Sequence, residues 1–149
     1  MRRIIAISSL ALIPLAAAAQ VLGDPDVIEA LMADQGMPVA RDIDDYGDPR
    51  ITSEVEGVQF AIYFYDCAPV CRSLQFVAAF DRDRNTSLAT ANEWNRDYRF
   101  AKVYVDDEGD PFIEMDVNLA GDGVGRRNFN DLLDGWRRTL ADFRDYINW

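Results

Sequence analysis

The chain has 149 residues, with 15 basic and 26 acidic side chains, a formal net charge of −11, and no histidine. This charge repels nucleic-acid phosphates and anionic membrane surfaces, so we expect no nucleic-acid partner. Without histidine the chain cannot build a Ser-His-Asp or Cys-His nucleophile, nor an imidazole metal site. The length suffices for one domain with its own hydrophobic core, but not for two.

The N-terminus has the pattern of a secretory signal peptide. Two arginines at positions 2 and 3 precede an apolar stretch from Ile4 to Leu15, and the alanines at 16–19 offer cleavage after Ala18 or Ala19. The stretch is shorter than the roughly 20 apolar residues of a membrane-spanning helix, although an uncleaved anchor is the alternative. We therefore expect residues 1–19 to be removed on export. The mature protein is then periplasmic or secreted, with no stable membrane insertion.

The first half of the mature chain predicts one helix followed by three strands. Asp24 caps a helix that reaches Gln35, and residues 39–48 form a loop or a short edge strand. Residues 51–55 and 58–65 alternate between apolar and polar around a two-residue turn at Glu56-Gly57. Residues 73–80 continue the alternation, so the three segments predict an antiparallel meander.

The second half predicts a helix, two strands and a long helix. Thr86 or Ser87 caps a helix that ends at Asp97, with an inward stripe of Leu88, Ala91, Trp94 or Asn95, and Tyr98. Residues 100–105 and 111–119 form a hairpin around an acidic turn. Gly125 is the expected N-cap of the last helix. Its apolar residues recur every three or four positions: Phe129, Leu132, Leu133, Trp136, Leu140, Phe143 and Ile147.

The run from Val58 to Asp116 resembles the YbjN family of bacterial proteins, which are described as regulators of sensory transduction. Its most specific parts are the segment Asn92-Glu93-Trp94-Asn95-Arg96 and the acidic turn that ends at Pro111. The resemblance covers about Asp24 to Ile147, so we expect one YbjN-like domain over residues 24–149. It implies an α+β fold like that of type III secretion chaperones, with helices packed on one face of a curved antiparallel sheet.

Cys67 and Cys71 bracket three residues between two strands that we expect to be hydrogen-bonded neighbours. At such a hairpin end their Cα atoms could lie within the roughly 4.4–6.8 Å that a disulfide needs. Because an exported protein meets an oxidising compartment, we expect a structural disulfide. A redox pair is the alternative, but the spacing departs from C-x-x-C.

Three groups of acidic residues are candidates for cation binding or acid–base chemistry. The segments that begin at Asp42 and Asp81 resemble the opening of an EF-hand loop, but both lack its terminal bidentate glutamate, so we expect no metal site. Glu114 and Asp116 alternate onto one face of a strand, where two carboxylates could act as acid and base. Chance proximity is the simpler interpretation in so acidic a chain, and we expect no enzyme activity and no cofactor.

The helix that carries the family motif is a candidate interaction or structural motif. Trp94 shares a stripe with Ala91 and Tyr98, so it belongs to the core. Asn92, Asn95 and Arg96 can hydrogen-bond a neighbouring turn. The turn that we expect them to fix contains Asp106, Asp107 and Asp110; a partner-binding surface is the alternative.

These observations favour a non-catalytic, exported domain that acts through protein contacts. The partner surface is either an open sheet edge or the face that bears Tyr63 and Tyr65. The expected partners are an unidentified protein or a second copy of the chain. The alternative function is a periplasmic sensor that binds a small molecule or a cation.

Overall fold

The computed structural model describes residues 20–149, and the predicted signal peptide at 1–19 lies outside them. The fold is α+β, as predicted. Its helices and strands, in chain order, are β1 (Gln20–Val21), α1 (Pro25–Asp34), β2 (Ala40–Ile43), β3 (Pro49–Val55), β4 (Val58–Tyr65), β5 (Ser73–Ala79), α2 (Leu88–Asp97), β6 (Lys102–Val105), β7 (Pro111–Asn118), β8 (Val124–Gly125) and α3 (Arg126–Ile147).

Six strands form one antiparallel sheet in the order β2-β3-β4-β5-β7-β6. The predicted meander and the second hairpin are both present, and β7 joins them by pairing with β5 as well as with β6. The turn between β3 and β4 is a two-residue hairpin turn, and Val55 pairs with Val58 across it. Its two central residues, Glu56 and Gly57, both have positive φ, 51° and 85°. Positive φ at both central residues matches the right-handed twist of the flanking strands, so the turn sets the register of β3 and β4.

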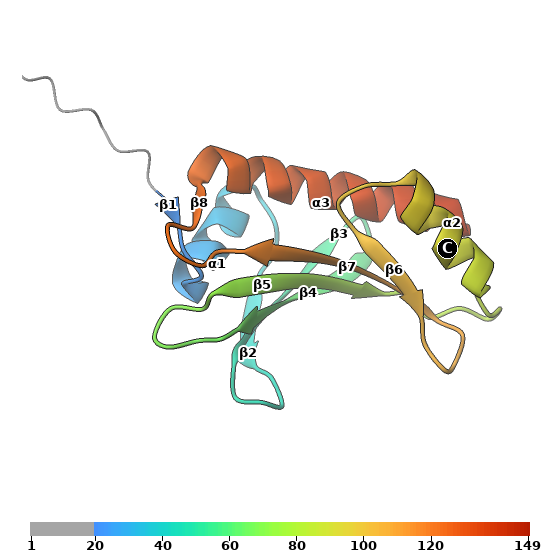
Figure 1. The fold of residues 1–149 in the computed structure, drawn as a ribbon, viewed down its shortest axis with the longest axis horizontal. Coiled ribbons are helices and arrows are strands. Elements are labelled where there is room, and N and C mark those ends of the chain that lie inside the picture. The colour runs from blue at the N-terminus through green and yellow to red at the C-terminus, as the bar shows by residue number, and fades with distance from the viewer. Residues whose placement is uncertain (1–19) are drawn as a thin grey trace, which may run out of the picture.

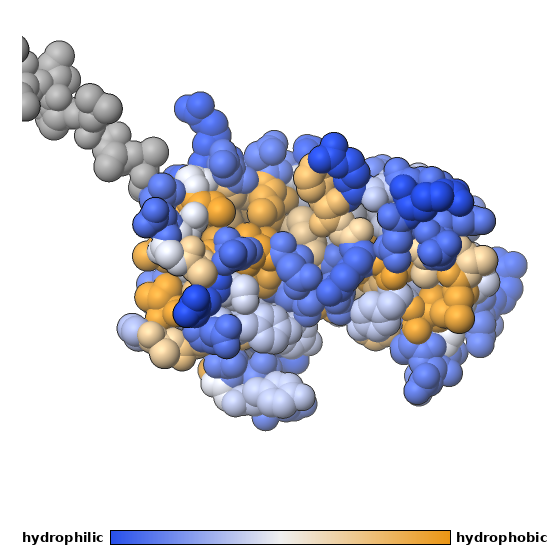
Figure 2. Space-filling model, viewed as in Figure 1, coloured by the Kyte–Doolittle hydropathy of each residue, from blue (hydrophilic) through white to orange (hydrophobic). Residues whose placement is uncertain are grey.

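The helices cover one face of the curved sheet, with α3 running along it, α1 near one end and α2 near the other (Figure 1). Figure 2 shows hydrophilic side chains along the outward side of α3 and apolar ones where it meets the sheet. The fully buried Trp136 of α3 packs against Phe60 of β4 and Phe76 of β5, with ring centroids 5.9 and 5.5 Å apart. One apolar core therefore joins the long helix to the centre of the sheet.

The helix ends agree with the sequence signals. Asp24 and Ser87 accept backbone N–H bonds at the starts of α1 and α2, and Gly125 is the N-cap of α3 without a side-chain bond. Two residues of the predicted inward stripe of α2 are exposed: Leu88 is 75% exposed, and the C-cap residue Tyr98 is 40% exposed although its ring stacks on Trp94. Because Leu88 is the first residue of α2, it extends past the edge of the core that Ala91 and Trp94 reach.

The sequence did not predict the short strands β1 and β8, and it left residues 39–48 undecided between a loop and a short edge strand. Residues 40–43 form β2, an exposed edge strand, which decides between the loop and the strand alternatives. The pair β1 and β8 has two residues each, too short for an alternation to show in sequence. Within residues 20–149, no helix combines the length and the apolar composition that a bilayer-spanning segment needs.

Candidate functional site

The sheet face opposite the helices carries the most distinctive surface among the described residues. Alternation along each strand sends one set of side chains into the core and the next set outward. The pairing register then aligns the outward set across five strands. We call this surface the open face, and its residues are Arg50, Thr52, Ala61, Tyr63, Tyr65, Gln75, Val77, Lys102, Tyr104, Phe112, Glu114 and Asp116.

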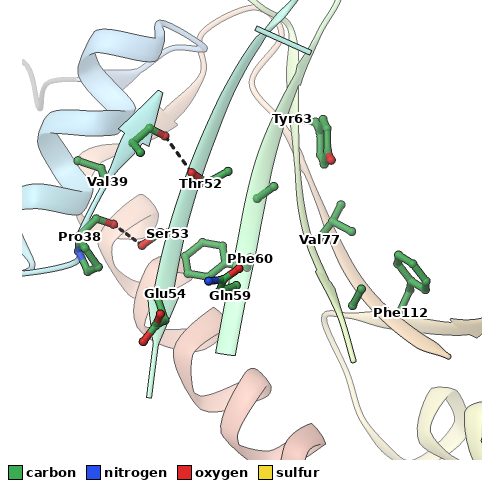
Figure 3. A pocket seen from close by; sticks show the side chains of 13 residues that line it. Pro38, Val39, Thr52, Ser53, Glu54, Gln59, Phe60, Tyr63, Val77 and Phe112 are labelled. Atoms are coloured by element: carbon green, nitrogen blue, oxygen red, sulfur yellow. Dashed lines mark hydrogen bonds between the residues drawn. The ribbon is translucent and has the colours of Figure 1, made fainter. Parts of the chain in front are cut away.

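The open face is concave. The β2–β3 and β6–β7 hairpins extend beyond the sheet on this side, and Figure 2 shows a hollow between them. A cavity of about 620 Å³ lies toward β3 and β4, and a second of about 340 Å³ adjoins it. Tyr63, Val77 and Phe112 line both cavities, and Figure 3 shows these three side chains pointing to the same side of the sheet. The two cavities therefore form one continuous groove.

Aromatic side chains dominate the floor of this groove. Tyr104 stacks on Phe112 with ring centroids 5.0 Å apart and an interplanar angle of 10°. The Arg50 guanidinium lies 5.9 Å from the Tyr63 ring centroid. Tyr65 and Tyr104 are 41% and 42% exposed. Partly exposed tyrosines bury a large area at small entropic cost, and they are enriched at protein interfaces.

A hydrogen-bonded network fixes the polar part of the open face. The Tyr65 hydroxyl donates to Gln75 Oε1 at 3.1 Å, and Gln75 Nε2 donates to Glu114 and Asp116 at 3.2 and 2.9 Å. Lys102 Nζ lies 3.1 Å from Glu114 and 3.2 Å from Asp116. Glu114 and Asp116, which the alternation predicted on one face, therefore lie together. The Gln75 amide and the Lys102 ammonium each bind both carboxylates.

Burial and the nearby carboxylates raise the pKa of two phenols of the open face, Tyr65 and Tyr104. Burial, followed by the negative charge of Glu114, raises the pKa of Tyr104 to about 12 and also raises the pKa of Tyr65. The hydrogen bonds to Glu114 and Asp116 raise the pKa of Lys102. At neutral pH the open face therefore presents neutral phenols around a charged carboxylate–ammonium cluster.

The groove of the open face is negatively charged, although the face itself carries two cations and two carboxylates. Both cations are already paired, Arg50 with Asp42 at 2.6 Å and Lys102 with Glu114 and Asp116. Asp44 and Asp45 line the rim of the groove. An incoming cation therefore meets carboxylates, whereas an incoming anion meets no cation that lacks a partner on this face.

In the helix motif that carries the family resemblance, one of the three predicted polar residues has a structural role, and its partner is not the one that we predicted. Asn95 donates to the Val103 carbonyl at 2.9 Å and accepts from the Val103 N–H at 2.8 Å, so it fixes β6 and not the acidic turn. Arg96 pairs with its neighbour Asp97, and Asn92 is exposed. The prediction that these side chains hold the acidic turn was wrong, because the turn lies beyond the far end of β6. Trp94 is buried, as predicted.

The acidic turn is held by its own residues and by the loop before α2. Asp106 Oδ1 accepts the N–H groups of Glu108 and Asp110, and Asp110 accepts the Arg82 N–H at 3.1 Å. Asp107 is exposed. Carboxylate oxygens of Asp106, Glu108 and Asp110 lie within 4.8 Å of one another. Since backbone N–H groups already bind two of these carboxylates, turn formation accounts for the cluster.

A disulfide joins Cys67 and Cys71 at the β4–β5 connection. Their Cα atoms are 3.8 Å apart, closer than the range expected from the sequence. Cys71 also donates its N–H to the Gly23 carbonyl at 3.0 Å, which ties this connection to the segment before α1. The bridge thus lies where two chain segments meet, as suits a structural role.

We expect the oxidised, processed protein to have an intact mass two hydrogens below that of its reduced form. Intact mass spectrometry before and after reduction and alkylation measures this difference, because only reduced thiols take up alkylating label. Two alkylated cysteines in the sample that was never reduced would contradict the prediction.

Several residues of the open face could not be found from sequence. Gln75, Lys102, Tyr104 and Phe112 each read as an ordinary strand residue. The strand pairing brings these residues together: Gln75 pairs with Asp116, Lys102 with Glu114, and Tyr104 with Phe112. The alternation of polar and apolar residues in β6 and β7 was the available signal, but it does not give register.

Comparison with known proteins gives a match to a protein family. The YbjN family model, described as "Putative bacterial sensory transduction regulator", matches residues 24–149. Neither the curated proteins nor the solved structures contain a match. The family match spans all the helices and nearly all the strands of the described domain, and the chain therefore belongs to the YbjN family.

Proposed function

We propose that this chain is an exported, non-catalytic regulatory domain that binds a partner protein through the open face. The observation that carries the proposal is the concave, aromatic sheet face that no helix of residues 20–149 covers. The family description as a regulator agrees with an interaction role. Partner binding on a sheet face uses aromatic side chains for contact area and polar groups for orientation.

The carboxylates that line the groove of the open face select the chemistry of the partner. A segment that carries lysine or arginine side chains complements the carboxylates at Asp44, Asp45 and Glu114. A second copy of the chain would bring another net charge of −11 to the contact, which opposes association. We therefore expect a basic partner in preference to a homodimer.

Export and the lack of catalysis are further parts of the proposal. Export is supported by the basic, apolar and small-residue pattern of the N-terminal sequence. The non-catalytic role is supported by Glu114 and Asp116, the best acid–base candidates, because Lys102 and Gln75 bind both carboxylates. A general acid or base needs a proton-transfer position that is open to substrate.

Lys102 provides a direct test, because it is the only lysine of the chain and it lies on the open face. An amine-reactive crosslinker applied to the host cells attaches at Lys102 or at the amino terminus. We expect one partner, captured through a lysine of its own, in near-equal amount. Mass spectrometry of the crosslinked peptides should place the link at Lys102.

Matched variants make the result specific to the open face. Lys102→Arg retains the charge and should lose the crosslink. Ala61→Arg places a bulky cation in the groove and should abolish capture of the partner through Lys102 and through the amino terminus. Ala33→Arg, the same change on the exposed side of α1, should leave capture unchanged. Equal capture by Ala61→Arg and wild type would contradict the proposal. Self-crosslinks alone would replace it with a homodimer.

A further inference from the structure

One edge of the sheet is only half covered. Strand β6 begins at Lys102, which lies opposite Glu114, so it pairs with the first part of β7 alone. Within residues 20–149, the second part of β7, from Met115 to Asn118, has a strand partner on the β5 side only. Figure 1 shows β6 beside one end of β7. We call the uncovered side of residues 115–118 the β7 edge.

The main-chain groups of Asp116 point out of the β7 edge. Just past β7, the Leu119 N–H donates to the carbonyl of Arg72 at 2.8 Å, so the odd-numbered residues of this strand bond to β5. The even-numbered residues face the other way, as Glu114 does toward β6. Asp116 is the next of them, and its N–H and carbonyl have no backbone partner on that side among the described residues. An added strand would bond to both groups.

Phe100 stops β6 from covering the β7 edge. In an uninterrupted pairing Phe100 would lie opposite Asp116, because Lys102 lies opposite Glu114. Its φ of 73° is instead in the left-handed region, which is unfavourable for a bulky residue. Phe100 is 78% exposed, so core packing does not explain this conformation. Strained residues of this kind cluster at ligand sites.

The outer edge of β6 is closed, in contrast to the β7 edge. Asn95 of α2 accepts from the Val103 N–H at 2.8 Å and donates to the Val103 carbonyl at 2.9 Å. These bonds occupy the outward groups of β6, so another strand cannot pair there. The side-chain bonds of Asp116 leave its own main chain uncapped. The β7 edge therefore offers a donor and an acceptor of the kind that Asn95 covers on β6.

A groove runs along the helical side of the β7 edge. Met115 and Val117 point to this side, where they are 8% and 5% exposed. Directly opposite residues of neighbouring strands point to the same side of a sheet. A strand added at the β7 edge would therefore direct the residues opposite Met115 and Val117 toward the groove. The groove has a volume of about 510 Å³, and its apolar lining includes Tyr98, Phe100, Met115 and Leu132.

Charge selects the residue between those two. The residue opposite Asp116 would point to the open face, beside Glu114, Asp116 and Lys102. Two carboxylates and one ammonium leave a negative charge there. The groove lining is also negative, because it holds three aspartates and two arginines: Asp116, Asp131, Asp142, Arg99 and Arg138. Opposite charges across a strand pair are stabilising and like charges are destabilising, so a lysine or arginine suits this position.

We propose that the β7 edge binds an extended segment of a partner protein, which adds as a strand antiparallel to β7 and in line with β6. A basic side chain lies opposite Asp116, between two apolar side chains that enter the groove. The main-chain bonds give affinity, and the alternation apolar–basic–apolar gives specificity. The site is separate from the groove of the open face, so the inference does not rest on the function proposed above.

Titration of the ¹⁵N-labelled, processed protein with the peptide acetyl-Thr-Val-Lys-Val-Thr-amide tests the proposal by NMR. Titration to about 10 mM covers complexes with dissociation constants in the millimolar range. We expect a saturable downfield shift of the Asp116 amide, because its N–H gains an acceptor. The Val103 amide should keep its shift, because Asn95 already binds it, and it serves as the internal reference.

Changes in the peptide separate the main-chain contact from the side-chain contact. N-methylation of the peptide lysine removes the donor to the Asp116 carbonyl and should weaken binding about tenfold or more. Glutamate in place of that lysine should weaken binding about fivefold, and Asp116→Asn should reduce this preference. Ala61→Arg, which blocks the open-face groove, should bind the peptide as wild type does. Failure at the β7 edge and failure at the open face are therefore separate results.

Three results would overturn the proposal. The first is the absence of a saturable shift at Asp116, and the second is equal binding of the methylated peptide or tighter binding of the glutamate peptide. The third is the same shift of the Asp116 amide when the protein concentration alone is raised, which would assign the β7 edge to a second copy of the chain.

Discussion

Replacement of Trp136 by alanine is expected to lower the free energy of unfolding by about 3 to 5 kcal/mol. The side chain is fully buried and packs on Phe60 and Phe76, which belong to the two central strands. A domain of this size has only about 5 to 15 kcal/mol of stability, so the loss is a large part of the total.

Urea denaturation followed by far-UV circular dichroism measures the effect. The adjacent exposed residue gives the control: Arg137→Ala removes a weak contact with Asp134 at 4.0 Å and should change stability by less than about 0.5 kcal/mol. Trp136→Phe should fall between the two, because it keeps an aromatic ring and removes an N–H that has no partner. A loss below about 1 kcal/mol for Trp136→Ala would show that α3 is not anchored at this residue.

The core position of Trp136 also matters for the open face. Phe60 and Phe76 point inward from the strands on which Tyr63 and Val77 point outward. The register that stacks the inner rings is therefore the register that aligns the outer groove. A shift by one residue would exchange the two faces, so core packing and groove shape are selected together.

The faces of the sheet could be predicted because their signal is local. Alternation in residues 58–65 assigned Phe60, Ile62 and Phe64 to one side and Tyr63 and Tyr65 to the other, and the structure buries the first set. The Glu56-Gly57 turn was predictable for the same reason, since turn chemistry depends on adjacent residues. Neither inference needed knowledge of which strands are neighbours.

The polar network depends on long-range placement. Gln75 reaches Asp116 only because β7 lies beside β5, and 41 residues separate the two side chains in sequence. Sequence periodicity shows which side of a strand or helix is apolar, but it does not show which strands lie next to each other.

Asn95→Ala is expected to lower the free energy of unfolding by about 1 to 3 kcal/mol. Asn95 makes two hydrogen bonds with the main chain of Val103, one through each end of its amide. Val103 is in β6, the edge strand beyond β7, so these bonds satisfy the outward N–H and carbonyl of an edge. Alanine removes both partners at once and leaves the backbone groups of a 5%-exposed residue with poor access to water.

Asn92→Ala is the matched control, because Asn92 lies about one turn earlier in the same helix and is exposed. The two substitutions change helix propensity equally, so their difference in urea unfolding isolates the contacts with Val103. Hydrogen exchange adds a local readout: the Val103 amide should lose protection in Asn95→Ala and keep it in Asn92→Ala. Equal stabilities would mean that water replaces the Asn95 amide at the edge. A difference above about 1 kcal/mol would show that Asn95 of α2 closes the β6 edge of the sheet.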